Sequence, residues 1–377
     1  MIGRLVLENG CVYEGKSFGY TGSVAGEVVF STNMTGYTES FTDPSFCDQI
    51  LCLTYPLIGN YGISEPSYDA YGIDKIFESN NIHIKALIVG EYNPKYSHWK
   101  GKRSLGEWLK EKNIIGISGI DTRELVKVIR ENKDIIARIG NNENINSKLN
   151  TVSIEDLNNQ IKSTDIFLKM NSSGKNILKD NKIIINENSS LLNILVIDCG
   201  IKNSQIRSLL KRNIQLTIVD LNYNFIDEVL SGKYNGIFIS NGPGNPQNSE
   251  NVITQLKQIF KSDFIIPIFG ICYGHQLLGL AAGFSVGKMK YGNRGHNIPA
   301  KLMIPEVDRC LITSQNHGYC LQDDQRPNNW EILFTNKNDN SNEGIYNTRY
   351  PLFSVQFHPE ARGGTNDAQF LFDIFDK

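Results

Sequence analysis

The sequence predicts an α/β protein with two domains, a β-rich mixed α/β domain followed by a doubly wound α/β domain. Its 377 residues are enough for two or three domains at ~150 residues each. From Arg4 to Tyr61 the chain is rich in glycine, β-branched and aromatic residues, whereas strand-like and helix-like segments alternate after residue 190. Residues 141–190 are instead crowded with Asn, Lys, Ser and Ile. We therefore expect a first domain at 1–140, a linker region at 141–190 and a second domain at 191–377.

The first domain is expected to begin with strands and to continue with helices. Apolar residues recur at helical spacing near Leu105 to Glu111 and from Thr122 to Glu131. The second of these segments has one apolar face, formed by Leu125, Val126, Val128 and Ile129. The domain is therefore expected to be mixed, with most of its strands in the first half.

A P-loop pattern in this domain is a false match. Residues Gly10 to Ser17 satisfy GxxxxGK[ST], which is typical of ATP binding. A P-loop must open a helix whose N-terminus receives phosphate, but Ser17 is followed by Phe-Gly-Tyr-Thr-Gly, which has no helical period. Asn9-Gly10 is instead typical of a hairpin turn. We expect no nucleotide site at this position.

The linker region is expected to contain one short helix, from Thr151 to Ile161. After it, Leu192 to Ile197 and Leu216 to Val219 have the composition of strands, with a helical segment from Gln205 to Leu210 between them. A further apolar strand is expected from Tyr234 to Ile239. This alternation is typical of a doubly wound α/β domain.

One cysteine of the second domain, Cys272, lies where a buried strand is expected to turn into a helix. Apolar residues within 265–269 predict the strand, and residues 276–281 have helical spacing. Gly270 and Gly274 supply the small residues that a tight turn around a nucleophile needs. The N-terminus of the helix would favour the thiolate over the thiol. Free cysteine is usually a small buried hydrophobe, so Cys272 alone would not predict a reactive thiol.

A second segment supplies the partners that cysteine catalysis needs. His358 and Glu360 follow an apolar strand, and on an extended chain two residues two apart emerge on one face. A histidine takes the thiol proton and returns it to the leaving group, while a carboxylate fixes the ring tautomer. A histidine at the end of a strand is more often structural, but its occurrence together with the cysteine turn predicts a catalytic triad.

These motifs carry a family resemblance. GICYGHQ around Cys272, the loop Ser240-Asn241-Gly242-Pro243-Gly244 and FHPE, in this order, resemble a class I glutamine amidotransferase over roughly the second half of the chain. The resemblance implies a nucleophile Cys272, an acid/base His358 and an orienting Glu360. It also implies an oxyanion hole lined by Gly242, Gly244 and the Tyr273 N–H. Taken alone, the loop would be an ordinary strand-to-helix turn.

The same resemblance implies a glutamine-binding set. Its members recognise the two ends of the substrate and are Ser45, Gln276, Asn316, Gly318 and Tyr319, beside the loop and Tyr273. Without the family match, Ser45 and the Asn316–Gly318 segment would be interpreted as turns. Tyr273 and Cys199 differ from the residues common in the family; we expect Tyr273 to act through its N–H, with a ring that alters the pocket mouth, and Cys199 to be structural. His275 is also expected to be mainly structural.

The first domain identifies the type of amidotransferase. LVLENGCVYEGKSFG, GEVVFSTNMTGYTESFTDPSF, LTYPLIGNYG and GIDTRELVKVIRE resemble the N-terminal domain of the carbamoyl phosphate synthetase small-subunit family. The resemblance implies glutamine hydrolysis here and ammonia transfer to a large ATP-dependent subunit that makes carbamoyl phosphate for arginine and pyrimidine synthesis. We expect no cofactor in this chain, with ATP and Mg²⁺ bound by the large subunit. Ammonia released into neutral water becomes mostly ammonium, so a sealed route to that partner is expected.

Composition excludes several other classes. The chain has 38 Lys and Arg against 40 Asp and Glu, a net charge of -2, and no basic stripe that would indicate nucleic-acid binding. Seven cysteines without CxxC pairs predict neither a disulfide framework nor a zinc site. No apolar run or leader is found, so we expect no membrane association and a location in a cytoplasm, or in a plastid stroma if the chain is organelle-encoded.

Two alternative functions remain open on the sequence. A glutaminase-dead scaffold would only bind and regulate a large subunit, and the intact triad argues against it. A cysteine peptidase could use the same turn and would need no partner, but the resemblance of the first domain argues against that function.

Overall fold

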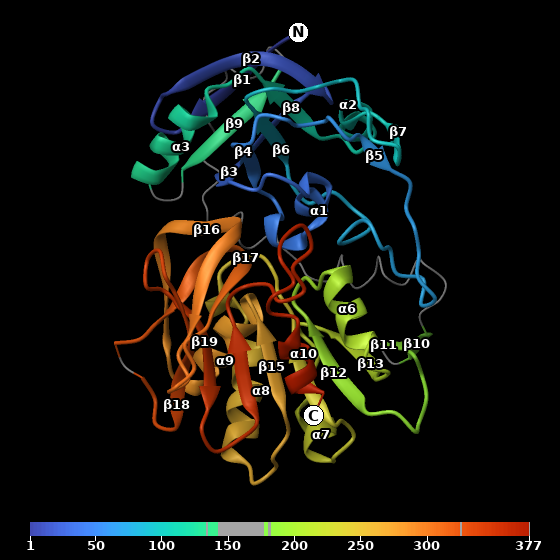
Figure 1. Cartoon of the computed structure of the whole chain (residues 1–377), viewed down its shortest axis with the longest axis vertical. Coiled ribbons are helices and arrows are strands. Elements are labelled where there is room, and N and C mark those ends of the chain that lie inside the picture. Colours follow the sequence, from blue (N-terminus) through green and yellow to red (C-terminus); the bar gives the residue numbers. More distant parts are fainter. Residues whose placement is uncertain (133–134, 142–176, 180–181, 325, 377) are drawn as a thin grey trace. The chain divides into compact units, whose positions relative to one another are not determined.

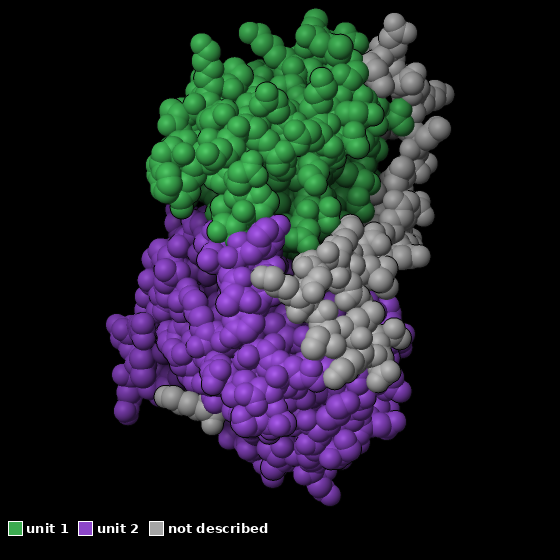
Figure 2. All heavy atoms as spheres, turned by 90° about the vertical axis from the view of Figure 1, so that its right-hand side faces the viewer, with its two compact units in different colours: residues 1–67, 76–161 green, residues 68–75, 162–377 purple. Residues whose placement is uncertain are grey.

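The computed structural model describes residues 1–132, 135–141, 177–179, 182–324 and 326–376. The chain divides into two compact units, coloured separately in Figure 2. The first comprises Met1–Ser67 and Ile76–Ile161, and the second comprises Tyr68–Lys75 and Lys162–Lys377. Each unit has hydrophobic core clusters of its own.

The first unit is built around a closed barrel with the strand order β1-β2-β8-β6-β4-β3-β9. Closure pairs every barrel strand on both sides, which removes the free sheet edges. The elements of this unit are β1 (Ile2–Leu7), β2 (Val12–Gly19), β3 (Ser23–Ser31), α1 (Tyr37–Thr42), η1 (Pro44–Phe46), β4 (Ile50–Leu53), β5 (Ile63–Ser64), β6 (Ala86–Val89), β7 (Gly101–Arg103), α2 (Leu105–Glu111), β8 (Ile115–Ser118), α3 (Thr122–Glu131) and β9 (Ile136–Gly140) (Figure 1).

The hairpin expected at Asn9-Gly10 is confirmed. Strands β1 and β2 pair antiparallel, and the Leu7 N–H donates to the Cys11 carbonyl oxygen at 2.9 Å across the turn. Gly10 has φ 90°, a left-handed conformation that favours glycine. Ser17 lies inside β2, so no helix begins where a P-loop would require one.

Both helices expected in the first domain are confirmed with the expected bounds. Helix α2 is capped by Ser104, whose hydroxyl accepts from the Glu107 N–H while the Glu107 carboxylate accepts from the Ser104 N–H. The Asp121 carboxylate caps α3. The sequence analysis missed α1, a short, largely buried helix that follows Gly36 in a left-handed conformation.

The second unit contains a sheet of eleven strands in the order β10-β11-β13-β12-β14-β15-β20-β19-β18-β16-β17. Its elements are β10 (Ile177–Lys179), β11 (Lys182–Ile185), β12 (Asn193–Asp198), α6 (Asn203–Leu210), β13 (Gln215–Asp220), α7 (Ile226–Leu230), β14 (Gly236–Ile239), η4 (Pro246–Asn248), α8 (Glu250–Lys261), β15 (Ile268–Ile271), α9 (Tyr273–Ala282), β16 (Ser285–Leu302), β17 (Cys310–Gln322), β18 (Trp330–Asn336), β19 (Asn342–Asn347), β20 (Leu352–Val355) and α10 (Phe370–Phe375).

The centre of this sheet is parallel and covered on both faces, which confirms the doubly wound pattern. β12 pairs in parallel with β13 and β14, β14 with β15, and β15 with β20. Alternate residues of β14 enter different cores: Phe238 packs in a cluster with residues of α6 and α10, whereas Ile237 and Ile239 pack in a cluster with residues of α8 and α9.

Two expectations about strand positions need correction. The buried strand expected within 265–269 begins only at Ile268, and the Ile265 side chain is 61% exposed. Pro267 has no N–H to donate to a ladder, which explains the late start of β15. Strands β10 and β11 lie inside the region expected as a linker, and β11 pairs with β13, so the sheet begins before residue 191. The helix expected from Thr151 to Ile161 lies outside the described residues.

The parallel strands bring the sequence motifs to one edge of the sheet. The carboxyl end of β12 leads to Lys202, that of β14 to Ser240, that of β15 to Cys272 and that of β20 to His358. Carboxyl ends of parallel strands lie on the same edge, where open α/β sheets form their ligand sites. Residues far apart in the sequence can therefore meet there.

Candidate active site

Cys272 occupies a strained turn between β15 and α9. Its backbone has φ 55° and ψ -100°, an unusual conformation for a residue with a side chain. The turn requires its glycines: a Cβ on Gly274 would lie 2.1 Å from the Ile239 carbonyl oxygen, and one on Gly270 would lie 2.6 Å from the Gly274 carbonyl oxygen. The strand, turn and helix expected around Cys272 are confirmed, and they have the geometry of a nucleophile elbow.

The Cys272 side chain is buried at the start of α9. It is 3% exposed, and its Sγ lies 3.7 Å from the backbone carbonyl oxygen of Asn316 on β17. The Cys272 N–H donates to the Val355 carbonyl oxygen at 2.8 Å, which ties the elbow to the end of β20. This bond brings the elbow next to the segment that carries His358.

His358 and Glu360 form a buried pair. His358 Nδ1 lies 2.8 Å from Glu360 Oε1, and the His358 N–H donates to the Ser314 carbonyl oxygen at 2.8 Å. The backbone turns between these two residues, since the Ala361 N–H donates to the His358 carbonyl oxygen. The two side chains meet as expected, although a turn rather than an extended strand brings them together.

The charges of this pair depend on each other. Burial alone would lower the pKa of His358, but the Glu360 carboxylate outweighs it, and the nearby Cys272 thiol acts in the same direction, so the pKa is raised. The other ring nitrogen, Nε2, has no partner with full hydrogen-bond geometry among the described residues. His358 thus combines a fixed Nδ1 with an Nε2 that can exchange a proton with the thiol side of the site.

Two residues that the sequence analysis missed hold Glu360. Lys202 Nζ lies 2.9 Å from Glu360 Oε1, and Gln205 Nε2 donates to the same oxygen at 3.2 Å. Burial raises the pKa of Glu360, but Lys202 and then His358 outweigh it and hold the pKa well below its ordinary range. Lys202 follows the carboxyl end of β12, a position that could have suggested a site residue, but no motif marked it.

The loop after β14 packs against the elbow, while its expected role in an oxyanion hole stays a prediction. The Gly274 N–H donates to the Ser240 carbonyl oxygen at 3.0 Å. A Cβ on Gly242 would lie 2.0 Å from the Cys199 carbonyl oxygen, and Gly244 has φ 90°, so both positions favour glycine. Cys199 is buried, and its N–H donates to the Ser240 hydroxyl, which agrees with a structural role.

The Tyr273 ring is buried, 6% exposed, rather than lying open in the manner expected for a residue at a pocket mouth. Its hydroxyl lies 2.8 Å from Ser249 Oγ and donates to the Asn245 carbonyl oxygen at 3.1 Å. Both partners follow the Ser240–Gly244 loop in the chain. The Tyr273 hydroxyl therefore holds the segment that follows this loop, while the role expected for the Tyr273 N–H stays a prediction.

Several residues expected to bind glutamine lie together in the second unit. Gln276 Nε2 donates to the Tyr319 carbonyl oxygen and to Gln356 Oε1, both at 3.0 Å. Asn316, from the same strand as Tyr319, contributes the carbonyl oxygen beside the Cys272 Sγ. Gly318 lies between them on β17. Their contacts with glutamine stay predictions.

Ser45 belongs to the first unit. It lies in η1, where its N–H donates to the Asp43 carboxylate at 2.9 Å. This local structure is the turn that Asp43-Pro44 predicts. Its expected contact with glutamine also stays a prediction.

His275 is not a second candidate base. It is fully buried, and its Nδ1 lies 2.9 Å from the Ser354 hydroxyl on β20. Burial lowers its pKa to about 3, so it is neutral. These contacts agree with the structural role expected for it.

Two searches of the described residues bear on other classes of site. No group of three or more His, Cys, Asp or Glu side chains in the described part of the chain is arranged to hold a metal ion. Within the same residues, no helix is both long and apolar enough to cross a membrane.

Family models match both halves of the chain. The model described as glutamine amidotransferase class-I matches residues 195–377. The model described as carbamoyl-phosphate synthase small chain, CPSase domain, matches residues 5–139. The two matches fall on the regions whose motifs carried the resemblance.

Individual relatives match nearly the whole chain. The arginine-specific small chain of carbamoyl phosphate synthase from Saccharomyces cerevisiae is 42% identical, over 98% of this chain and 86% of the relative. The multifunctional protein ura1 from Schizosaccharomyces pombe is 46% identical over 98% of this chain, which spans only 17% of that relative. A solved glutamine amidotransferase from Thermotoga maritima is 20% identical over 45% of this chain and 76% of its own, with a TM-score of 0.36.

Proposed function

The chain belongs to the carbamoyl-phosphate synthase small-chain family, and we propose that it is the glutamine-hydrolysing subunit of such a synthase. The observation that carries this proposal is the arrangement at the sheet edge, where Cys272 on a strained elbow lies beside the buried His358–Glu360 pair. A cysteine, a histidine and a carboxylate in this arrangement are suited to attack on an amide carbonyl.

The reaction would begin with the Cys272 thiolate attacking the γ-amide carbon of glutamine. The Tyr273 N–H and the glycine loop would stabilise the oxyanion of the tetrahedral intermediate. His358, whose raised pKa supplies a proton at neutral pH, would protonate the departing ammonia. His358 would then take a proton from water, which attacks the thioester carbon and releases glutamate and the thiolate.

Glu360 would act by holding the imidazolium form of His358 in one orientation. Its own charge is maintained by Lys202, which contacts the same carboxylate oxygen. A carboxylate that became neutral would no longer stabilise the charged ring. We therefore propose that Lys202 and Gln205 are positioning residues of the triad, acting through Glu360.

The ammonia is proposed to pass to a large ATP-dependent subunit, which would bind ATP and Mg²⁺ and join the ammonia with bicarbonate into carbamoyl phosphate. The names of the relatives support this division, since one is an arginine-specific small chain and others are multifunctional proteins of which this chain matches less than a fifth. Arginine and pyrimidine synthesis are the proposed uses of the product.

The experiment is to measure glutamate release from glutamine by wild type and Cys272→Ala, each with and without a large synthetase subunit. We expect release that depends on Cys272 and rises with the partner. In the complex, Cys272→Ala should abolish glutamine-dependent synthesis and leave ammonia-dependent synthesis intact. Equal loss of both syntheses would contradict the proposed division of labour.

Two other functions are outcomes of the same experiment. Wild type without glutamate release in either condition would favour a scaffold that only binds the large subunit. Peptide cleavage that depends on Cys272, without glutamate release from glutamine, would favour a peptidase.

A further inference from the structure

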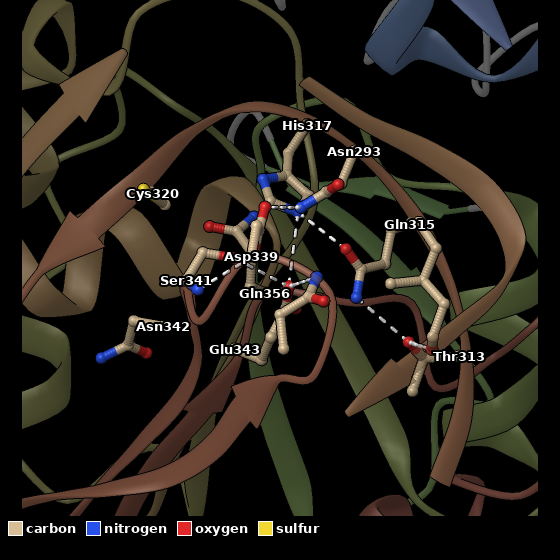
Figure 3. A network of polar contacts seen from close by, with 12 residues as sticks. Asn293, Thr313, Gln315, His317, Cys320, Asp339, Ser341, Asn342, Glu343 and Gln356 are labelled. Carbon is tan, nitrogen blue, oxygen red and sulfur yellow. Dashed lines mark hydrogen bonds and ion pairs between the residues drawn. The ribbon is translucent and has the colours of Figure 1, made fainter. Parts of the chain in front are cut away.

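A buried carboxyl group that the proposed mechanism does not use lies near residues expected to bind glutamine. Glu343, on β19, has no exposed surface, and its Oε1 accepts a hydrogen bond from Asn336 Nδ2 at 2.9 Å. Its Oε2 has no hydrogen-bond partner among the described residues. The same Oε1 lies 3.9 Å from His317 Nε2, and Figure 3 shows both residues within one polar network. Ser341 Oγ also donates to Oε1, at 3.5 Å, but these donors are uncharged, so a buried carboxylate in this position would be unfavourable without a positively charged partner.

Both ring nitrogens of His317 face hydrogen-bond acceptors, an arrangement that favours a proton on each nitrogen. Thr313 Oγ1 donates to the Ile298 carbonyl oxygen at 2.7 Å, so it can only accept from Gln315 Nε2, at 3.1 Å. This contact orients the Gln315 amide, and its Oε1 faces His317 Nε2 at 3.0 Å. His317 Nδ1 faces the Tyr319 carbonyl oxygen at 2.9 Å. Both nitrogens thus face acceptors, whereas a neutral ring has only one N–H.

The surroundings favour a pair that carries no net charge. Burial raises the pKa of Glu343 to about 8 and lowers that of His317 to about 4. Whether the pair is a carboxylic acid with a neutral ring or a carboxylate with an imidazolium, it holds one proton and is neutral overall. The titratable and charged groups that face the pair are Asp339, Arg294, Cys320, His275 and His358.

The pair is connected to the expected glutamine site by two routes. The Tyr319 carbonyl oxygen that His317 faces also accepts from Gln276 Nε2 at 3.0 Å. Gln276 donates as well to Gln356 Oε1, and the Gln356 N–H donates to the Glu343 carbonyl oxygen at 2.9 Å. A change at the pair therefore reaches Gln276 through a side chain and through the backbone.

We propose that Glu343 is a positioning residue for glutamine, which shares one proton with His317 so that the neutral pair holds the Tyr319 carbonyl and, through it, Gln276. This inference rests on the proposed function, because Gln276 and Tyr319 are expected to bind glutamine. Loss of the shared proton would leave a net negative charge inside the network and loosen these contacts. The effect would fall on KM for glutamine rather than on kcat, since Glu343 does not touch the reacting atoms.

The experiment measures KM and kcat for glutamine between pH 6 and pH 9.5 for wild type and Glu343→Gln, as complexes with the large subunit. At pH 7 we expect similar KM values for wild type and Glu343→Gln. The amide of the variant is uncharged, and the wild-type pair with its shared proton carries no net charge either. At pH 9 the wild-type KM should be about tenfold higher than that of the variant, because one unit above a pKa of about 8 leaves about one molecule in ten protonated. The two kcat profiles should stay parallel.

A matched control removes other causes of pH dependence. Glu331→Gln changes an exposed carboxylate on the neighbouring strand β18, where Glu331 pairs with Arg326, and its KM profile should follow that of wild type. Titration of the substrate's own amino group would affect all three proteins alike. Identical KM profiles for wild type and Glu343→Gln, or a difference confined to kcat, would overturn the proposal.

A second readout needs no turnover. In wild type labelled with ¹⁵N-histidine, the ring nitrogens of His317, assigned with a His317→Gln variant, should shift between about pH 7 and 9 as the pair loses its proton. The His317 resonances of Glu343→Gln should stay constant over this range. Constant His317 resonances in wild type would overturn the shared proton even if the chain proved inactive, whereas absence of glutaminase activity alone would count only against the proposed function.

Discussion

Two buried histidine–glutamate pairs lie in the second unit, and they differ in what surrounds the carboxyl group. His358 Nδ1 and Glu360 Oε1 lie 2.8 Å apart, and Lys202 Nζ lies 2.9 Å from the same oxygen. His317 Nε2 and Glu343 Oε1 lie 3.9 Å apart, and that Glu343 oxygen accepts a hydrogen bond from the uncharged Asn336 amide at 2.9 Å. The first pair is a candidate for proton transfer, whereas the second is a candidate for holding a proton in place.

The comparison teaches that a neighbouring cation decides the direction in which a buried carboxyl group titrates. Burial raises the pKa of both Glu360 and Glu343. At Glu360, Lys202 and His358 outweigh burial and hold the pKa well below its ordinary range. At Glu343 burial prevails, and the pKa is raised to about 8. The same residue type thus has its pKa shifted in opposite directions at two buried positions of the second unit.

The largest effect is expected from removing the charge of the first pair. In Glu360→Gln, kcat for glutamate release should fall about 10³–10⁴-fold, because the amide cannot stabilise the imidazolium or fix its tautomer. The pKa of His358 should fall as well, since burial would no longer be opposed by a carboxylate. Steady-state kinetics measure the fall in kcat, and circular dichroism checks that the variant is folded. A loss below tenfold would show that Glu360 is not an essential partner of His358.

The next prediction removes the cation that distinguishes the two pairs. Lys202→Met should lower the free energy of unfolding of the second unit by roughly 3 kcal/mol, because it leaves a buried carboxylate with one partner fewer. Glu360 titrates below its ordinary value of 4.5, so its contribution to stability is present above that pH and is lost as the pH falls through the folded pKa. The variant should lose that contribution at a less acidic pH than wild type.

Urea unfolding between pH 3 and pH 7 measures both effects of Lys202→Met. The matched control is Lys233→Met, which removes an exposed lysine that lies 3.2 Å from Glu228. That change should alter stability by less than about 1 kcal/mol. Equal effects of the two substitutions would mean that the Lys202 contact does not control the charge of Glu360.

The His317–Glu343 pair should make the free energy of unfolding of wild type depend on pH. The native pair keeps one proton up to about pH 8, whereas an unfolded chain has lost both protons above about pH 6.5. Wild type should therefore lose about 1 kcal/mol of stability per pH unit between these values, because the native state binds more protons than the unfolded state. In Glu343→Gln neither state releases a proton in that range, so its stability should stay level. Denaturant unfolding at several pH values would contradict this if the two curves ran parallel.

The smallest effect is expected at the neutral donor of the first pair. Gln205→Met removes the amide that donates to Glu360 Oε1 at 3.2 Å but leaves Lys202 in place. We expect kcat to fall only a fewfold and stability to change by about 1 kcal/mol, the usual net worth of one hydrogen bond. Kinetics compared side by side with Lys202→Met measure the difference. A loss of stability as large as that of Lys202→Met would show that the number of hydrogen-bond donors, rather than the positive charge of Lys202, keeps Glu360 ionised.

Much of the fold could be predicted because its signals are local. Helices α2 and α3 have the expected bounds, since capping residues and apolar spacing lie within one segment. Helix α1 was missed because it is short and polar in sequence and begins after Gly36 in a left-handed conformation. Strand β11 was missed because its composition resembles that of the residues before it. It is recognised as a strand only from its pairing with β13 in the folded chain.

The candidate site divides in the same way. Cys272, His358 and Glu360 could be named from short motifs, because a nucleophile elbow and a histidine–carboxylate pair need particular residues at fixed local spacing. Lys202 and Gln205 could not, since each meets Glu360 only after the strands have assembled. A lysine in a sequence is most often exposed, so nothing marked Lys202 as buried.

The sequence by itself determined which side chains can react, because nucleophiles, bases and the glycines of a tight turn are properties of residue type and local spacing. The tertiary structure decided which of them carry charge. Lys202 beside Glu360 and uncharged amides around Glu343 are contacts between distant segments, brought together at the carboxyl edge of the parallel strands and in the sheet that extends them. Charge in a protein interior depends on burial and on the nearest partners, and both exist only once the chain has folded.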